Sequence, residues 1–145
     1  MTKTLKNIIG WLIYLCILVG LVLGIPPGLS YLLKTPHPIA SITSSSMWPA
    51  LKKGDLVFIK GELSKEDIAI GDIIVYENKL GFTIHRVISK NDETVITKGD
   101  ANNTNDAPVV YEEIVGKAVF VGDSPLRIPY FGNISILFGK ARDKI

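Results

Sequence analysis

A long uncharged run near the N-terminus limits what this chain can fold into more than any other feature. No charged residue occurs within residues 7–33, and the apolar core of the run is the 18 residues 8–25. As a helix this core is about 27 Å long, close to the ~30 Å hydrocarbon layer of a bilayer. Trp11, Tyr14 and Tyr31 lie near its two ends, where aromatic side chains favour the membrane interface. The run therefore predicts one N-terminal transmembrane helix.

Two prolines follow the apolar core. We expect Pro26 and Pro27 to kink or end the helix, because proline lacks a backbone N–H and clashes with the preceding turn. Residues 29–33 then form a short continuation at the far interface, bounded by Lys34. This divides the chain into a membrane anchor, residues 1–34, and a second domain, residues 35–145.

A cleaved signal peptide and a buried core helix are the alternatives for this run. Signal peptides have a shorter apolar region followed by a small-residue cleavage site, whereas this run is longer and no such site follows it. A buried helix rarely runs so long without one polar residue. Lys3 and Lys6 on the short flank favour a cytoplasmic N-terminus by the positive-inside rule. We therefore expect a single-pass protein of the cell membrane with residues 35–145 outside the cytoplasm.

The charged residues are concentrated after the anchor. Of the 16 basic and 14 acidic residues, 13 basic and all 14 acidic ones follow Lys34, so residues 35–145 carry a net charge of −1. A nucleic-acid-binding domain would need a clustered basic face, so we expect no nucleic acid partner. The only cysteine, Cys16, lies inside the apolar run, and no cysteine or histidine spacing indicates a metal site. We expect no disulfide within the chain, no metal and no cofactor.

Short runs rich in β-branched and aromatic residues recur through the second domain, with turn residues between them. The expected strands are residues 39–43, 56–59, 73–76, 82–88, 94–97 and 114–121. Outside the anchor no segment has sustained 3.6-residue periodicity. The pattern predicts a mainly β fold, a small β-barrel or sandwich-like domain that follows one N-terminal transmembrane helix.

Residues 126–138 are unusually apolar for the end of a chain. Pro129, Gly132 and Asn133 interrupt them, and the stretch is too short to span a bilayer securely. Two interpretations are open: packing in the core of the domain, or a segment that lies on the membrane surface.

Three consecutive serines, residues 44–46, follow the first expected strand. Serine is common in turns, but a hydroxyl at a strand end could also face a cleft. A serine nucleophile needs a base, and the base needs an orienting group. His85 lies in an expected strand and acids occur in the polar loop 100–106, whereas His37 lies in a proline-rich connector. Spacing leaves their geometry open, and a satisfied, half-buried histidine is the alternative for His85.

Four short motifs follow one another behind the anchor. They are Ser-x-Ser-Met-x-Pro at residues 44–49, Gly-Asp before apolar residues at 71–76, His-Arg-Val-Ile at 85–88 and Lys-Gly-Asp-x-Asn at 98–102. Each is weak alone, but their order resembles that of the type I signal peptidases, membrane-bound serine endopeptidases that remove signal peptides from secreted proteins. The chain is most similar to the archaeal and endoplasmic-reticulum branch, and the resemblance covers nearly all of it.

The resemblance implies roles for individual residues. Ser46 is the nucleophile, and Ser44 supplies a hydroxyl to the oxyanion hole. His85 stands where the bacterial branch has lysine, so it is the general base of a Ser-His-Asp system. Asp106 is the stronger match for the acid that orients His85, with Asp100 in a supporting role.

The resemblance also implies a substrate and partners. Precursor proteins with signal peptides would bind as an added strand beside the segment that leads to Ser46. Shallow pockets, with Ile42 and Ile84 as expected walls, would accept only small side chains at positions −1 and −3. The other expected partners are the lipid bilayer and the secretion channel.

Two rival functions are weighed against this one. A Ser-Lys protease of related fold, including the self-cleaving repressor type, would need a lysine base, and Lys90 and Lys98 are the nearest in sequence. A catalytically inert, membrane-anchored β module that binds partners is the second rival.

Overall fold

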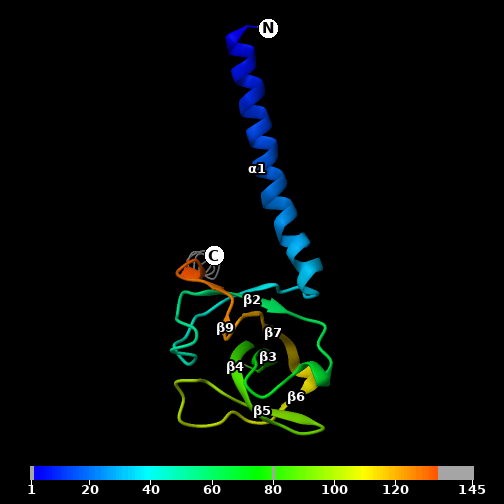
Figure 1. Ribbon diagram of the computed structural model, residues 1–145, viewed down its shortest axis with the longest axis vertical. Coiled ribbons are helices and arrows are strands. Elements are labelled where there is room, and N and C mark those ends of the chain that lie inside the picture. The colour runs from blue at the N-terminus through cyan, green and yellow to red at the C-terminus, as the bar shows by residue number, and fades with distance from the viewer. Residues whose placement is uncertain (1, 80, 134–145) are drawn as a thin grey trace. The chain divides into compact units, whose positions relative to one another are not determined.

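The N-terminal unit of the chain is a helix, α1 (Lys3–Leu33) (Figure 1). The computed structural model describes residues 2–79 and 81–133, and two compact units, Met1–Leu32 and Leu33–Ile145, divide the chain. With 31 residues, α1 is long and apolar enough to cross a bilayer, and none of its residues is buried in the protein. The prediction of one such N-terminal helix is confirmed.

Pro26 and Pro27 do not end this helix, because α1 runs through both of them to Leu33. Each proline removes one backbone donor, but proline is tolerated in membrane helices and is more frequent there than in soluble ones.

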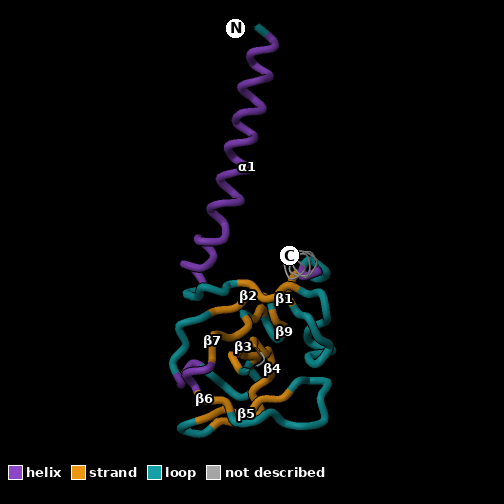
Figure 2. The backbone as a smooth tube through the Cα atoms, turned by 180° about the vertical axis from the view of Figure 1, so that it is seen from behind, coloured by secondary structure: helices purple, strands orange, loops and turns teal. Residues whose placement is uncertain are grey.

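The second unit is an antiparallel sheet, seen from two sides in Figures 1 and 2. Its strands are β1 (Ile39–Ser41), β2 (Leu56–Lys60), β3 (Ile73–Asn78), β4 (Gly81–Lys90), β5 (Thr94–Lys98), β6 (Val109–Val110), β7 (Ile114–Ala118) and β10 (Arg127–Ile128). The order is β1-β2-β7-β3-β4-β5-β6, and β10 pairs with β2. Short 3₁₀ turns, η1 (Lys65–Asp67) and η2 (Tyr111–Glu113), and a hairpin of β8 (Phe120–Val121) and β9 (Ser124–Pro125) complete the described part.

The mainly β class is confirmed, and the sheet of the described residues is open rather than a closed barrel. The expected strand 39–43 ends at Ser41, and the expected strand 114–121 is divided into β7 and β8. The division falls at Val119: its backbone N–H still donates to the Phe58 carbonyl of β2 at 2.9 Å, whereas the residues after it, Phe120 and Val121, pair with β9.

Strand β3 lies at the centre of the sheet and contributes to both of its apolar clusters. Successive side chains of a strand point to opposite faces. Ile73 and Val75 therefore pack in one cluster, with Ile42, Met47, Leu51, Val57, Ile59 and Ala118. Ile74 and Tyr76 pack in the other, with Ile68, Val87, Val95 and Val109. A strand that is buried on both faces explains the unbroken apolar run at residues 73–76.

The described part of the apolar stretch 126–138 forms an edge of the sheet. Arg127 and Ile128 pair with Val57 and Leu56 of β2, while Tyr130 and Phe131 are exposed. The remainder of that stretch, residues 134–138, lies outside the described residues.

Candidate active site

Ser46 lies in a turn that is held in place by buried side chains and backbone hydrogen bonds. Past the end of β1, the Ile42 N–H donates to the Asp55 carbonyl at 2.9 Å, which ties the segment to the start of β2. Met47 and Leu51 are fully buried, and the Leu51 N–H donates to the Met47 carbonyl at 2.9 Å. Ser46 therefore sits on a rigid support next to the apolar core.

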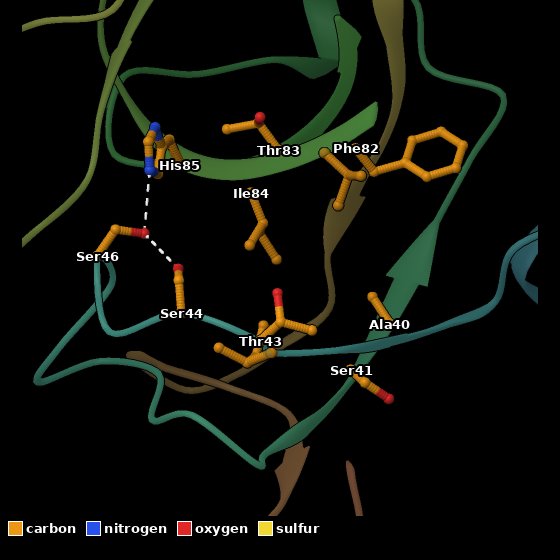
Figure 3. A pocket seen from close by; sticks show the side chains of 11 residues that line it. Ala40, Ser41, Thr43, Ser44, Ser46, Phe82, Thr83, Ile84 and His85 are labelled. Carbon is orange, nitrogen blue, oxygen red and sulfur yellow. Dashed lines mark hydrogen bonds between the residues drawn. The ribbon is translucent and has the colours of Figure 1, made fainter. Parts of the chain in front are cut away.

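His85 and Asp106 complete a hydrogen-bonded chain with Ser46. The Ser46 Oγ lies 3.1 Å from His85 Nε2, and His85 Nδ1 lies 2.6 Å from Asp106 Oδ2 (Figure 3 shows the first contact). An ionised carboxylate only accepts hydrogen bonds, so Nδ1 of a neutral imidazole carries the proton here. Nε2 then has a free lone pair that can accept a hydrogen bond from the Ser46 hydroxyl.

The strand β4 delivers His85 to this position. His85 pairs with Ile74 of β3 and is only 8% exposed. Its ring lies on the face of the sheet shared with Thr83 and Val87, because side chains two residues apart on a strand share a face. Burial on an ordered strand limits the movement of the ring.

Asp100, the other acid of this loop, pairs with Arg86 instead. Its two carboxylate oxygens accept from Arg86 Nε and Nη2 at 2.8 and 2.7 Å, and Arg86 Nη1 donates to the Gly71 carbonyl at 2.8 Å. The hydrogen bonds that Arg86 donates to Asp100 raise the pKa of its guanidinium. Since His85 and Arg86 are consecutive residues of β4, the two acids serve side chains on opposite faces of the same strand.

The loop that carries Asp100 also contacts the backbone of Ser46. The Ala101 N–H donates to the Ser46 carbonyl at 2.8 Å. A Cβ at Gly99 would lie 2.7 Å from that same carbonyl oxygen, so a side chain there would push the two loops apart. The absence of a side chain at Gly99 thus allows the loop that carries the acids to pack against Ser46.

The hydroxyl of Ser44 contacts Ser46 itself. The two Oγ atoms are 3.0 Å apart, and Figure 3 shows Ser46 between Ser44 and His85. Because Ser46 directs its proton to His85 in the arrangement above, Ser44 is the donor in this pair. Ser45 is exposed.

A cleft of about 340 Å³ opens beside these residues (Figure 3). It is lined by Ala40, Ser41, Ile42, Thr43, Ser44, Ser46, Val75, Phe82, Thr83, Ile84 and His85. Ile42 and Ile84, the two expected wall residues, both line it; Ile42 is only 2% exposed and belongs mainly to the core. The cleft therefore runs between the segment that leads to Ser46 and the first half of β4.

A second cavity of about 210 Å³ shares part of this lining, including Ala40 and Phe82, and is also lined by His37. The ring of His37 lies 5.4 Å from that of Phe82. The interpretation of His37 as a linker residue missed this position, because nothing in the sequence shows that the connector folds back against β4.

The chemistry available at the site is that of a serine activated by a histidine. Within residues 2–79 and 81–133, no group of three or more histidine, cysteine, aspartate or glutamate side chains is arranged to hold a metal ion. A hydroxyl that can pass its proton to an oriented imidazole can attack a carbonyl carbon, and this is the basis of acyl transfer by serine hydrolases.

Comparison with known proteins finds catalytic subunits of the signal peptidase complex among the similar chains. No family model matches the chain. The chain is 36% identical over 122 residues to the signal peptidase complex catalytic subunit SEC11 of Lachancea thermotolerans, covering 75% of this chain and 70% of that protein. It is 32% identical over 122 residues to the SEC11 subunit of Colletotrichum graminicola and 31% identical over 122 residues to that of Fusarium vanettenii, covering 78% of this chain and 70% of each relative.

Proposed function

The chain belongs to the type I signal peptidases, in the endoplasmic-reticulum-type branch of the SEC11 catalytic subunits, and we propose that Ser46, His85 and Asp106 carry out its cleavage of signal peptides from precursor proteins. The observation that carries this assignment is the continuous contact from Ser46 Oγ through His85 to Asp106 Oδ2, at 3.1 and 2.6 Å.

The reaction follows from these contacts. Ser46 Oγ attacks the carbonyl carbon that precedes the scissile bond while its proton passes to His85 Nε2. Asp106 holds the Nδ1 proton and stabilises the imidazolium that forms. The imidazolium then gives its proton to the departing amine, which leaves an acyl-enzyme. Water, deprotonated by His85, releases the signal peptide and restores Ser46.

Ser44 is the proposed side-chain donor of the oxyanion hole, together with the backbone N–H of Ser46. Its hydroxyl, 3.0 Å from Ser46 Oγ, needs only a rotation about its Cα–Cβ bond to turn from the nucleophile toward the new oxyanion. Donors aimed at developing oxygen charge are worth on the order of 10²- to 10³-fold in rate.

The signal peptide is proposed to bind as an extended strand along the cleft. Thr43 and Ser44 are exposed and line the cleft beyond the end of β1, where a substrate strand could add main-chain hydrogen bonds. In such a strand the side chains at −1 and −3 point the same way, toward the walls formed by Ile42 and Ile84. A cleft of about 340 Å³ shared by several substrate residues suits small side chains at these two positions.

The placement of the enzyme in the membrane is also a proposal. Residues 1–34 are the anchor, with Lys3 and Lys6 on the cytoplasmic side, and residues 35–145 are the catalytic domain on the opposite side of the cell membrane. Its relatives are named as subunits of a signal peptidase complex, so we propose that this chain works with further subunits and beside the secretion channel. Tethering at the bilayer raises the effective concentration of the membrane-inserted substrate.

Substrate selectivity tests this function. The full chain in detergent is expected to convert a precursor with Ala at −1 and −3 into the mature protein, cut after the −1 residue as determined by the mass of the product. Leu at −1 should lower kcat/KM by about 100-fold, because its larger side chain would clash with the walls formed by Ile42 and Ile84. Leu at −2 is the matched control and should have little effect, since that side chain points away from the pocket walls. Equal cleavage with Leu at −1, or cleavage at another bond, would contradict the proposal.

A further inference from the structure

Two buried hydroxyl side chains lie next to Asp106 and have no part in the reaction described above. Thr97 is 0% exposed and Tyr76 is 5% exposed. The Thr97 Oγ1 donates to Asp106 Oδ2 at 2.7 Å, and this is the same carboxylate oxygen that accepts from His85 Nδ1 at 2.6 Å. Thr97 and His85 thus share one oxygen of the acid.

The sheet brings these groups together from three neighbouring strands. Tyr76 of β3 pairs with Thr83 of β4, and Val87 of β4 pairs with Thr97 of β5. Directly paired residues share a face, as do residues two apart on one strand. Tyr76, His85 and Thr97 therefore all lie on one face of the sheet, and the loop after β5 brings Asp106 to it.

The number of hydroxyl protons determines which group donates in the Thr97–Asp106 and Tyr76–Thr97 contacts. Thr97 has one hydroxyl proton, and the carboxylate can only accept, so that proton is used on Asp106. Tyr76 OH, 3.4 Å from Thr97 Oγ1, is then the group that can donate across this contact. Burial raises the pKa of the Tyr76 phenol by more than the hydrogen bond with Thr97 lowers it, and the charge of Asp106 adds to the rise, so the phenol keeps its proton.

Thr97 holds Asp106 at two points. Its hydroxyl donates to the carboxylate, and its backbone carbonyl accepts from the Asp106 N–H at 2.8 Å. The terminal torsion of an aspartate side chain is broad rather than confined to sharp rotamers, so a carboxylate needs hydrogen bonds to hold one oxygen on its partner. His85 alone provides one such bond, and Thr97 provides a second from a buried, ordered strand.

We propose that Thr97 is a positioning residue for signal-peptide hydrolysis: its hydroxyl, supported by Tyr76, fixes Asp106 Oδ2 on His85 Nδ1. The proposal rests on the proposed roles of His85 and Asp106. It assigns Thr97 no contact with the substrate, so its loss changes the chemical step and leaves substrate binding as it was.

Kinetics of matched variants test this role. Thr97→Val keeps the shape of the side chain and removes the hydroxyl; we expect kcat to fall by about 10- to 100-fold, as for a lost hydrogen bond to a charged group, with KM within about twofold of the wild type. Thr97→Ser keeps the hydroxyl and should restore kcat to within a few-fold. Tyr76→Phe should lower kcat by only a few-fold. If Thr97→Val does not fold, as judged by thermal unfolding, Thr97→Ala takes its place.

A double variant separates positioning from a general loss of packing. Thr97→Val should lower kcat little further in an Asp106→Asn background, because both changes act through the same group. Unchanged kcat in Thr97→Val, a loss in Thr97→Ser as large as in Thr97→Val, a change confined to KM, or a fully multiplicative loss in the double variant would each overturn the proposal.

Proton NMR provides a readout that does not depend on catalysis. The Nδ1 proton of His85, hydrogen-bonded to Asp106, should give a far-downfield resonance that is assigned by its loss in His85→Ala. Thr97→Val should shift or broaden this resonance, and Thr97→Ser should preserve it. An unchanged resonance in Thr97→Val would overturn the positioning role, whether or not the wild-type chain cleaves a precursor. Absence of precursor cleavage by the wild-type chain would refute the proposed function instead.

Discussion

Replacing His85 by alanine is expected to lower precursor cleavage by on the order of 10⁶-fold, the scale of loss when the histidine of a serine protease is removed. No other described side chain is hydrogen-bonded to Ser46 Oγ as a base: its partners are His85 Nε2 at 3.1 Å and the Ser44 hydroxyl at 3.0 Å. Without the imidazole, the Ser46 proton has no acceptor, and Asp106 has nothing to orient. The loss should appear in kcat, with the precursor still bound.

Lys90→Ala and Lys98→Ala are the matched controls for this prediction. Lys90 Nζ donates to the carbonyls of Ile68 and Lys65, which occupies it away from the serine. Lys98 belongs to β5, where it pairs with Arg86. Both variants should keep cleavage within a few-fold of the wild type. Full activity in His85→Ala together with loss of activity in either lysine variant would instead establish a Ser-Lys mechanism.

Asp106→Asn is expected to lower kcat by on the order of 10⁴-fold, as in serine proteases whose orienting aspartate becomes asparagine. The amide can donate toward His85 Nδ1, which favours the tautomer with the proton on Nε2. The nitrogen that faces Ser46 would then be a donor, and it could no longer take the serine proton. The fold should be kept, because the amide is nearly the same size as the carboxyl group.

Asp100→Asn is the comparison that separates the two acids. It removes the charge opposite Arg86, which Asp100 contacts through both oxygens. We expect it to destabilise the domain by about 1–3 kcal/mol, the range for hydrogen bonds to charged groups, while kcat stays within about tenfold of the wild type. Thermal unfolding and cleavage kinetics measure the two effects. A kcat loss in Asp100→Asn that matches the loss in Asp106→Asn would contradict this division of roles.

The helix and the family were the features most accessible from the sequence. Residues 7–33 carry no charge, so hydropathy and length alone predict a membrane helix, and no tertiary contact is needed to make the prediction. The four motifs identified the signal peptidase family through their order, and the SEC11 relatives confirm the family. The apolar run and each of the four motifs are short stretches of consecutive residues, so they can be recognised from the sequence without a structure.

The features that could not be predicted depend on contacts between distant segments. Thr97 and Tyr76 look like ordinary strand residues, and only the register of β3, β4 and β5 brings their hydroxyls to Asp106. Likewise, His37 looks like part of a connector until the chain places it against Phe82. The close approach of Gly99 to the Ser46 carbonyl is a further example, because the Lys-Gly-Asp-x-Asn motif does not show which segment its loop contacts.

In the loop 100–106, the contact of one acid was predicted from the sequence and the contact of the other was not. The family resemblance favoured Asp106 over Asp100 for the contact with His85, but it did not indicate that Asp100 forms an ion pair with Arg86. The pairing partner of each acid follows from which face of β4 the loop crosses, and this is a property of the folded sheet.

The most direct test of the central assignment is cleavage of a signal-peptide precursor by the full chain in detergent, with the wild type and Ser46→Ala compared under identical conditions. The mass of each product identifies the bond that is cut, and Ser45→Ala controls for a change of hydroxyl in the same turn. We predict mature protein from the wild type and from Ser45→Ala, and none above the uncatalysed background from Ser46→Ala. Equal amounts of product from the wild type and Ser46→Ala would contradict the account, as would the absence of product from the folded wild-type chain.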